Sequence, residues 1–319
     1  MHVQFNSTSV DEEGEPSTEV RIRRARIWVA TAVNDWIDAA VQVDVAREKA
    51  AARYAFVRLA LTDEVRLSFG QFKRAFDLFQ ITSSSQILVV ERAGNVRGVA
   101  PCSGVGGVCS YSRFAEQLEF TSLDVGALLE GQLADGRIRY LLTATNGPGG
   151  NARDENDAKS GSMRVEWSPA ESLRLGGNVA AHDFPNPVLG VDQHAPAWAA
   201  DVEWGNFTEG LHLQAGVMGG ENWRNLNTAG EASDFLTWQT IASYRVPLSG
   251  QRIRAIEPVA RASWGDPDRG MASDGGHLFT PGLMVHFDGR NKMAMNVDIW
   301  RPHSGASQWS LKIQSYVHF

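Results

Sequence analysis

The chain has 319 residues, a formal net charge of −7 and a mean hydropathy of −0.25. No apolar run reaches the roughly 18 to 20 residues of a membrane-spanning helix, which excludes helical insertion, and the absence of a dominant basic cluster excludes a nucleic-acid partner. Two globular domains or one large β-domain fit this composition, and so does a transmembrane β-barrel, because its strands average out as mildly polar.

The N-terminal segment, MHVQFNSTSVDEEGEP, carries no basic and apolar leader. We expect the export signal to be absent from this chain, since the C-terminal features described below indicate an exported protein. A partial first strand is predicted at residues 3–6.

The following segments alternate apolar and polar residues with a period of two. Between Arg21 and Val33, residues such as Arg24 and Arg26 share one face, and Ile27 and Val29 share the other. A two-residue turn at 34–35 leads into a second alternating run at 37–45. Two such runs joined by so short a turn predict a β-hairpin.

The same hairpin unit recurs to the C-terminus and brings the count to about sixteen strands, an even number typical of bacterial outer-membrane barrels. The further strands are predicted at 54–59, 65–71, 123–130, 138–145, 163–167, 173–181, 200–204, 211–217, 235–246, 253–264, 283–287, 293–299 and 309–319. Every second connection is short, and the others are long: 7–18, 73–116, 147–160, 183–196, 220–233, 265–276 and 302–307. This parity is typical of a membrane barrel, and a Greek-key sandwich has no reason to keep it.

Periodicity alone does not tell the inner face of a barrel from the outer face. A barrel of about sixteen strands has a lumen too wide to fill with side chains, so the lumen is wet and the charged faces suit it. The apolar faces are bordered by aromatic residues, as at a membrane interface. These residues are Trp167, Trp204, Trp264, Phe287, Trp309 and Phe319. A soluble all-β protein is the alternative.

The last strand supports the same interpretation. The segment WSLKIQSYVHF is amphipathic and ends on Phe319. A terminal aromatic residue on such a strand resembles the signal that outer-membrane assembly machinery recognises. We therefore expect this machinery and outer-membrane lipid among the partners of the chain.

One long connection, at residues 73–117, differs from the others in composition. It mixes apolar residues with Lys73, Arg74, Ser83, Ser84 and Arg92, and is too apolar for a surface loop. Long connections of this kind are usually functional. We expect it to fold inside the barrel.

The two cysteines of the chain, Cys102 and Cys109, lie in the same connection and are separated by a glycine-containing segment. They fit a small disulfide loop in an oxidising compartment better than a metal site, which would need more ligands. The acidic run at 154–157 lacks the spacing of a calcium-binding loop. No metal, cofactor or catalytic grouping is predicted.

Several segments resemble the phosphate-selective porin O and P family of outer-membrane channels. They are RIRRARIWV, GQFKRAFDLFQITSSSQILVVERA, LDVGALLEGQLADGRIRYLLTATNGPGG, the NDAK at 156–159 and the EPVAR at 257–261. The resemblance implies one domain over residues 1–319, an antiparallel barrel of sixteen strands that is commonly trimeric, and a third long loop that narrows the lumen. It also implies the bacterial outer membrane as the location.

The resemblance implies a basic pore lining as well. On this sequence the lining corresponds to Arg24, Arg26, Lys73, Arg74, Ser83, Ser84 and Arg92, and Arg58 is a further charge on the face assigned to the lumen. Arginine donates paired hydrogen bonds to anions, and rings of Arg and Lys form anion-selective pores. Arg23 is a further candidate, with a strand-end position facing lipid headgroups as its alternative.

The expected function is passive diffusion of small hydrophilic solutes, anions such as phosphate or polyphosphate among them, without a chemical step. Lumen-facing acids such as Asp38, Asp44 and Glu130 are about as numerous as the bases, so a weakly selective general porin is the alternative. A membrane-barrel enzyme or a soluble β-rich binding protein is the second alternative.

Overall fold

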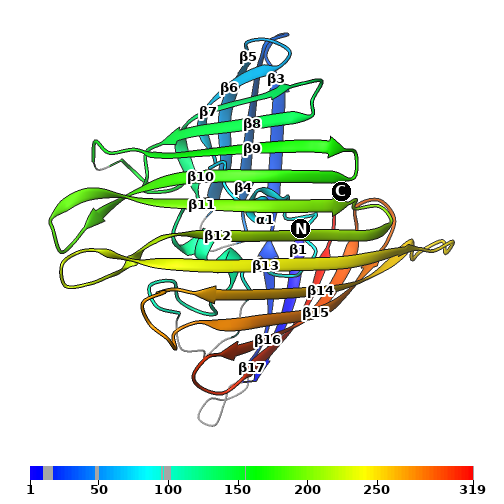
Figure 1. The fold of residues 1–319 in the computed structure, drawn as a ribbon. Helices are drawn as coiled ribbons and strands as arrows, with labels where there is room; N and C mark the ends of the chain where they lie inside the picture. Colours follow the sequence, from blue (N-terminus) through cyan, green and yellow to red (C-terminus); the bar gives the residue numbers. More distant parts are fainter. Residues whose placement is uncertain (10–16, 47–49, 95, 97–101, 155, 319) are drawn as a thin grey trace.

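The structure is a computed structural model that describes residues 1–9, 17–46, 50–94, 96, 102–154 and 156–318. Figure 1 shows that the strands form one continuous curved sheet around a short helical segment. The terminal Phe319, and Glu155 within the acidic run, lie outside the described residues.

The described chain has seventeen strands and two short helices. The strands are β1 (His2–Ser9), β2 (Ser17–Arg24), β3 (Arg26–Ala32), β4 (Ile37–Asp44), β5 (Ala51–Ala60), β6 (Val65–Lys73), β7 (Leu123–Leu133), β8 (Ile138–Thr145), β9 (Ser160–Ala170), β10 (Leu173–Asn186), β11 (Val191–Gly205), β12 (Gly210–Leu226), β13 (Ala232–Pro247), β14 (Ala255–Asp266), β15 (Gly276–His286), β16 (Lys292–Pro302) and β17 (Gln308–Tyr316). The helices are α1 (Leu78–Ile81) and α2 (Tyr111–Gln117).

Each strand pairs antiparallel with its neighbours, and β1 closes the ring by pairing with β17 on one edge and β2 on the other. Only Ala25 separates β2 from β3, so these two strands are one crossing of the barrel wall. The first half of this crossing pairs with β1, and the second half pairs with β4. The expectation of an all-β antiparallel barrel with about sixteen strands is therefore confirmed.

The two faces of the sheet differ as expected for a wet lumen. Outward-facing apolar side chains such as Val20, Val29 and Phe69 are 71%, 63% and 49% exposed. Inward-facing polar side chains such as Gln214 and Asn296 are buried inside the barrel. Apolar residues on the outside and polar residues on the inside are the arrangement that a lipid environment requires.

Several strands extend further than the alternation predicted. The connection expected at 183–196 shrinks to residues 187–190 between β10 and β11, and that expected at 220–233 shrinks to 227–231 between β12 and β13. The additional residue pairs between the strands, such as Asp183 opposite His194, contain polar residues, and the alternation of apolar and polar residues no longer marks them as strand. Backbone pairing continues there because it does not depend on the side-chain pattern.

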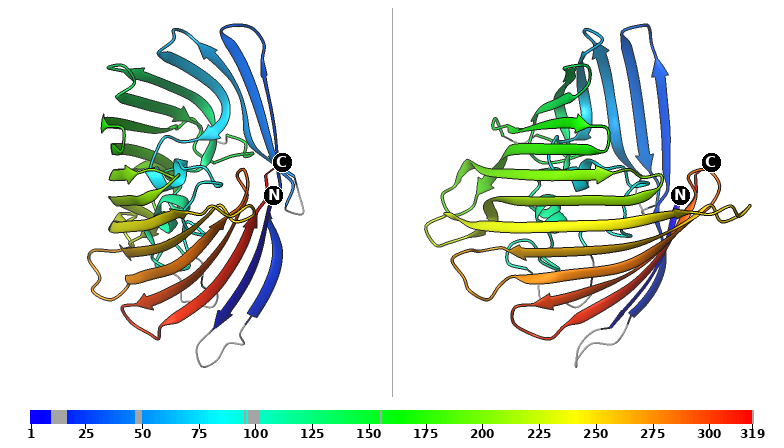
Figure 2. Two further views of the ribbon diagram at one scale, coloured as in Figure 1. Left: turned by 90° about the vertical axis from the view of Figure 1, so that its right-hand side faces the viewer. Right: turned by 45° about the vertical axis from the view of Figure 1, so that its right-hand side comes forward.

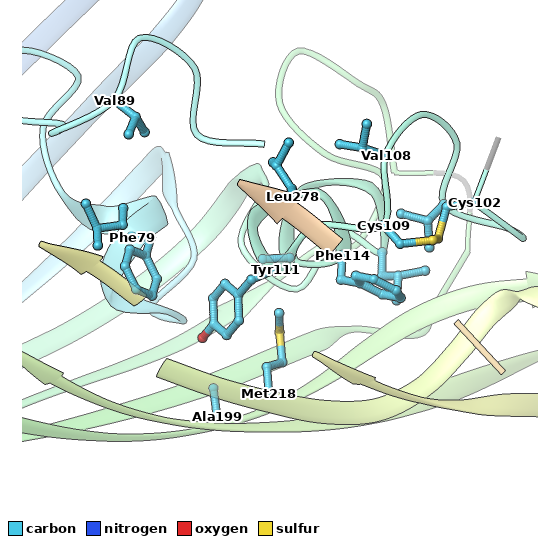
Figure 3. Packing of buried hydrophobic residues seen from close by; sticks show 14 of the residues in the cluster. Phe79, Val89, Cys102, Val108, Cys109, Tyr111, Phe114, Ala199, Met218 and Leu278 are labelled. Carbon is cyan, nitrogen blue, oxygen red and sulfur yellow. A yellow bond between two sulfur atoms is a disulfide. The ribbon is translucent and has the colours of Figure 1, made fainter. Parts of the chain in front are cut away.

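The described residues of the connection between β6 and β7, which are 74–94, 96 and 102–122, fold inward, and we call them the inner loop. Both views in Figure 2 show this segment inside the curve of the sheet. Its apolar side chains pack against inward-facing residues of β11 to β16, such as Ala199 on β11, Met218 on β12 and Leu278 on β15. Figure 3 shows this contact. The inner loop thus fills one side of the lumen with a hydrophobic core.

The described helices are short, and none of them is long and apolar enough to cross a membrane.

Phe114 tests how much the inner loop stabilises the barrel. Its side chain is fully buried and stacks on Phe235 with ring centroids 5.0 Å apart. We expect Phe114→Ala to lower the free energy of unfolding in detergent micelles by about 3–5 kcal/mol, because it opens a cavity. The control is Phe279→Ala, whose ring is 48% exposed on the outer face. An equal loss in both variants would contradict a stabilising core inside the lumen.

Candidate functional site

The inner loop begins with one helical turn whose start is fixed by Asp77. The Asp77 carboxylate accepts hydrogen bonds from the backbone N–H groups of Phe79 (3.1 Å) and Gln80 (3.2 Å). The Asp77 backbone N–H donates to Asn178 Oδ1 on β10 (3.1 Å). Helix α1 is therefore capped at its N-terminus and tied to the wall at the same residue.

Two cationic side chains donate hydrogen bonds to α1 and to the residue that directly follows it. Lys73 Nζ donates to the backbone carbonyl (2.7 Å) and to the side-chain oxygen (3.2 Å) of Gln80. Arg92 donates to the carbonyl of Phe79 (2.9 Å) and to that of Thr82. These contacts position Ser83, Ser84 and Ser85, which we call the serine tip.

The return path of the inner loop is bound by side chains of the opposite wall. Arg261 on β14 donates to the carbonyls of Glu91 (2.9 Å) and Arg92 (2.5 Å), and it pairs with Asp298 at 2.8 Å. Lys292 donates to the carbonyl of Ile87 at 3.1 Å. The wall thus supplies partners for loop carbonyls that no secondary structure pairs. Arg261 is the last residue of the EPVAR segment.

Four arginines of the crossing formed by β2 and β3 face the lumen, although strict alternation would turn only half of them inward. The pairing of β1 with β2 shifts register between His2 and Val3, opposite residues 22–24. Arg21 and Arg23 approach Glu91 of the inner loop, while Arg24 and Arg26 line a cavity. An irregularity of this kind reverses the face on which later side chains lie.

That cavity, of about 530 Å³, lies between the serine tip and the wall of β2, β3 and β5. We call it the basic cavity. Its charged lining consists of Arg24, Arg26, Arg53, Lys73, Arg92 and Arg290, and its other polar lining includes Ser83, Ser84, Ser85, Gln42, Gln80, His2 and His318. No described residue of the lining is Asp or Glu.

One hydrogen bond connects the barrel wall to the serine tip at the basic cavity. Arg26 Nη1 on β3 donates to Ser84 Oγ of the serine tip at 3.0 Å. The Arg26 Nε atom lies 3.1 Å from Asp44 Oδ2, so one acidic neighbour neutralises part of this charge. Within the described part of the chain, Arg24, Lys73, Arg92 and Arg290 have no carboxylate within 4.0 Å. The basic cavity therefore carries excess positive charge.

Several acidic side chains elsewhere in the lumen pair with arginines. Asp38 accepts two hydrogen bonds of 3.0 Å from Arg58, and Arg58 also reaches Glu130 at 3.5 Å. Further pairs are Arg164–Asp201, Arg174–Glu203 and Arg139–Glu130. These acids are neutralised locally, whereas most cations of the basic cavity are not.

Six of the predicted site residues meet in the basic cavity: Arg24, Arg26, Lys73, Ser83, Ser84 and Arg92. Arg58 lines a separate cavity beside the short turn between β5 and β6, together with Arg66, Glu130 and Arg139. Arg74 lies outside both cavities and is 1% exposed. The structure therefore gives Arg58 and Arg74 surroundings different from those of the other six.

Arg74 fastens the start of the inner loop. Its guanidinium pairs with the buried carboxylate of Asp124 at 2.5 Å and donates to the carbonyls of Glu119 (2.7 Å) and Gly147 (2.8 Å). A disulfide between Cys102 and Cys109, whose Cα atoms are 5.3 Å apart, closes a small ring within the inner loop itself. Both cysteines belong to the hydrophobic core that the inner loop forms with the wall.

Sequence reasoning missed Arg53, Ser85 and Arg290 as lining residues. Arg53 faces the cavity because the pairing of β4 with β5 shifts register between Gln42 and Val43, which alternation does not reveal. Arg290 lies in the short turn between β15 and β16. The only sequence signal there is the DGRNK turn, and a turn sequence does not predict which way its side chains point.

Glu91 attaches the inner loop to β2 through an ion pair with Arg23. It accepts hydrogen bonds of 2.5 Å and 3.0 Å from Arg23. Burial disfavours its ionised form, but Arg23 outweighs burial and lowers the pKa of Glu91 to about 2. Glu91 is therefore charged at all physiological pH values and holds the inner loop against the wall.

The comparisons with known proteins agree with this fold. A family model described as phosphate-selective porin O and P matches residues 1–196. No curated protein matches the chain.

Solved structures match the fold over nearly the whole chain at low sequence identity. An anion-selective porin from Comamonas acidovorans has a TM-score of 0.70 and 11% identity, covering 98% of this chain and 96% of its own. The outer membrane channel DcaP of Acinetobacter baumannii has a TM-score of 0.61 and 11% identity, covering 99% and 95%. OmpT of Vibrio cholerae in its trimer form has a TM-score of 0.59 and 11% identity, covering 99% and 97%.

The pair formed by Glu91 and Arg23 makes stability depend on pH. Because the pKa of Glu91 falls from 4.5 to about 2, the pair stabilises the folded state above about pH 4.5, and this contribution disappears as the pH falls towards 2. We expect Glu91→Gln to lower the free energy of unfolding by ~3 kcal/mol at pH 7 and by nothing at pH 2. Denaturant unfolding in micelles across this range measures the difference.

Asp288→Asn is the matched control, since Asp288 pairs with Arg254 and its side chain is 68% exposed. An exposed pair contributes little, so this variant should follow the wild type at every pH. A gap between Glu91→Gln and the wild type that persists at pH 2 would contradict the role of the ion pair.

Proposed function

Because this chain belongs to the phosphate-selective porin O and P family and is a non-enzymatic porin of the bacterial outer membrane, we propose that it conducts small hydrophilic anions, phosphate among them. The basic cavity is the observation that carries this proposal. The inner loop fills one side of the lumen, and the remaining space beside the serine tip is lined by six cationic side chains. Ions crossing the barrel would pass this region.

The lining chemistry suits oxyanions. Guanidinium groups donate paired hydrogen bonds to two oxygens of one anion, and hydroxyls replace part of its hydration shell. Arg26 and Ser84 already lie 3.0 Å apart across the cavity, so one anion can contact wall and loop together. The positive field lowers the local concentration of cations and raises that of anions.

The pairing of the lumen acids supports the same preference. Asp38, Glu130, Asp201 and Glu203 each have an arginine partner within 3.5 Å, which cancels most of their field at a distance. Among the described residues, Arg26 pairs with Asp44 at 3.1 Å, whereas Arg24, Lys73, Arg92 and Arg290 have no carboxylate within 4.0 Å, so these cations of the basic cavity are compensated less. The structurally similar Comamonas protein is described as an anion-selective porin.

We further propose a homotrimer in the membrane. OmpT of Vibrio cholerae, with a similar fold, is described in a trimer form. The outer face of β2 to β5 in this chain is rich in exposed β-branched apolar residues, such as Val20, Ile22, Val29 and Val57. Such a surface suits close contact between neighbouring barrels as well as lipid.

The reversal potential of the purified protein in a planar bilayer under a KCl gradient tests the proposed selectivity. We expect a potential of anion sign in the wild type. In the triple variant Arg24→Gln, Lys73→Gln and Arg290→Gln, the ratio of anion to cation permeability should fall by about tenfold or more, since each unit charge about 4 Å from a permeating ion contributes roughly 1 kcal/mol in water and about 1.4 kcal/mol corresponds to a factor of ten.

The control removes three charges that lie outside the basic cavity: Arg137→Gln, Arg252→Gln and Arg269→Gln. These side chains are exposed and do not line the basic cavity. The control should keep the wild-type potential. Phosphate added to the wild type should lower the chloride current. A wild-type potential near zero would instead establish a weakly selective general porin, and a potential of cation sign would contradict the proposed anion preference.

A further inference from the structure

Three aromatic side chains face the lumen directly beside the basic cavity, and we call them the aromatic shelf: Trp28 on β3, and Tyr54 and Phe56 on β5. The Trp28 ring lies 6.1 Å from Tyr54 and 6.5 Å from Phe56, at interplanar angles of 65° and 58°. Trp28 and Tyr54 both line the basic cavity. Cations alone would suffice for inorganic anions, so these rings call for another explanation.

Neither of the usual roles of aromatic residues in a barrel fits Trp28. It shares a face with Arg26, so it does not belong to the outer band of aromatics at the membrane interface. It is 50% exposed, whereas core aromatics of the inner loop such as Phe76 and Tyr111 are 0% exposed. The shelf is therefore an accessible apolar surface in a lumen that is otherwise polar.

The wall around Phe56 extends this apolar surface. Across the ladder, Phe56 lies opposite Ala40 on one side and Gly70 on the other, and Gly70 lies opposite Gly126. These inward positions carry no polar side chain. A flat ring can thus approach the wall over Ala40, Gly70 and Gly126, and the Arg58 guanidinium lies beside this surface, 5.7 Å from the centroid of the Phe56 ring.

Cations adjoin the shelf on the side of the serine tip. Arg26 precedes Trp28 by two residues on the same face of β3, which places their Cα atoms about 7 Å apart. Arg26 already faces one carboxylate, Asp44, at 3.1 Å, and Arg24 lies in the same cavity without one among the described residues. This spacing matches a ring that carries one anionic group directly attached to it.

We propose that the aromatic shelf and the two arginines form a binding site for aromatic carboxylates, so that the channel prefers ring-bearing organic anions over acyclic ones. The ring packs on Trp28 and Tyr54, while the carboxylate accepts hydrogen bonds from Arg24 and Arg26. This inference names a substrate class for the proposed anion channel and rests on that function. The site favours ligands with one negative charge over ligands with several, because Asp44 already neutralises part of the charge of Arg26.

The test compares benzoate with acetate as blockers of the chloride current through the full chain in planar bilayers. Both probes carry one carboxylate, so only the ring differs. Benzoate should halve the current at a concentration about two- to tenfold lower than acetate, the range that contact between aromatic rings contributes. Equal concentrations would overturn the inference, and this wild-type comparison needs no variant.

Variants then assign the preference to the shelf. In Trp28→Leu combined with Tyr54→Leu, the two probes should block at the same concentration. The control, Trp198→Leu, replaces a tryptophan that is 47% exposed on the outer face of β11 and should keep the wild-type difference. A preference for benzoate that survives in the double variant would overturn the assignment.

The reversal potential of the same preparations separates the two proposals. Anion selectivity without a preference for benzoate removes the aromatic-carboxylate site and leaves the anion porin standing. A channel without anion selectivity removes the proposed function itself, whatever the two probes do.

Discussion

The inner loop depends on buried arginines that the barrel wall and the loop share. Arg74 pairs with Asp124 where the loop leaves β6, and Arg261 pairs with Asp298 while donating to two loop carbonyls. Removing one partner of such a pair leaves a charge buried without compensation, which is strongly destabilising. These interactions fix the loop in one position and thereby decide which part of the lumen stays empty.

The hydrophobic core beneath the loop follows from that anchoring. A barrel of this size has no core of its own, because its lumen is too wide to be filled by the wall. The inner loop supplies one from side chains such as Phe76, Phe114 and Phe120, which pack on β11 to β16. The basic cavity then remains beside the wall of β2 to β5, where the arginines of the RRAR segment lie.

Charge in this lumen is organised by pairing rather than by composition. A net charge of −7 over the whole chain coexists with a cavity whose described lining contains no acid. Acids such as Asp38 and Asp201 are bound to arginines, so their fields fall off quickly, while the cations around the serine tip act together. A permeant ion responds to the local field and not to the total charge of the protein.

The sequence by itself determined the barrel. Alternation with a period of two and the regular succession of short turns specify the strands and their approximate number, since these features depend only on neighbours along the chain. The lipid-facing side followed from the width of the lumen that about sixteen strands imply. The cationic and hydroxyl residues of the cavity were also recognisable, because Arg24, Arg26, Lys73, Ser83, Ser84 and Arg92 stand in segments that resemble the family.

Only the tertiary structure decided how these residues divide their roles. Arg74 and Arg92 look alike in the sequence, yet one is buried against Asp124 and the other lines the cavity. The inward turn of Arg21 and Arg23 arises from a register shift between paired strands, and the pairing of acids with bases joins strands that the sequence does not connect. Such contacts form between distant segments, so their outcome depends on the closed ring and the folded inner loop together.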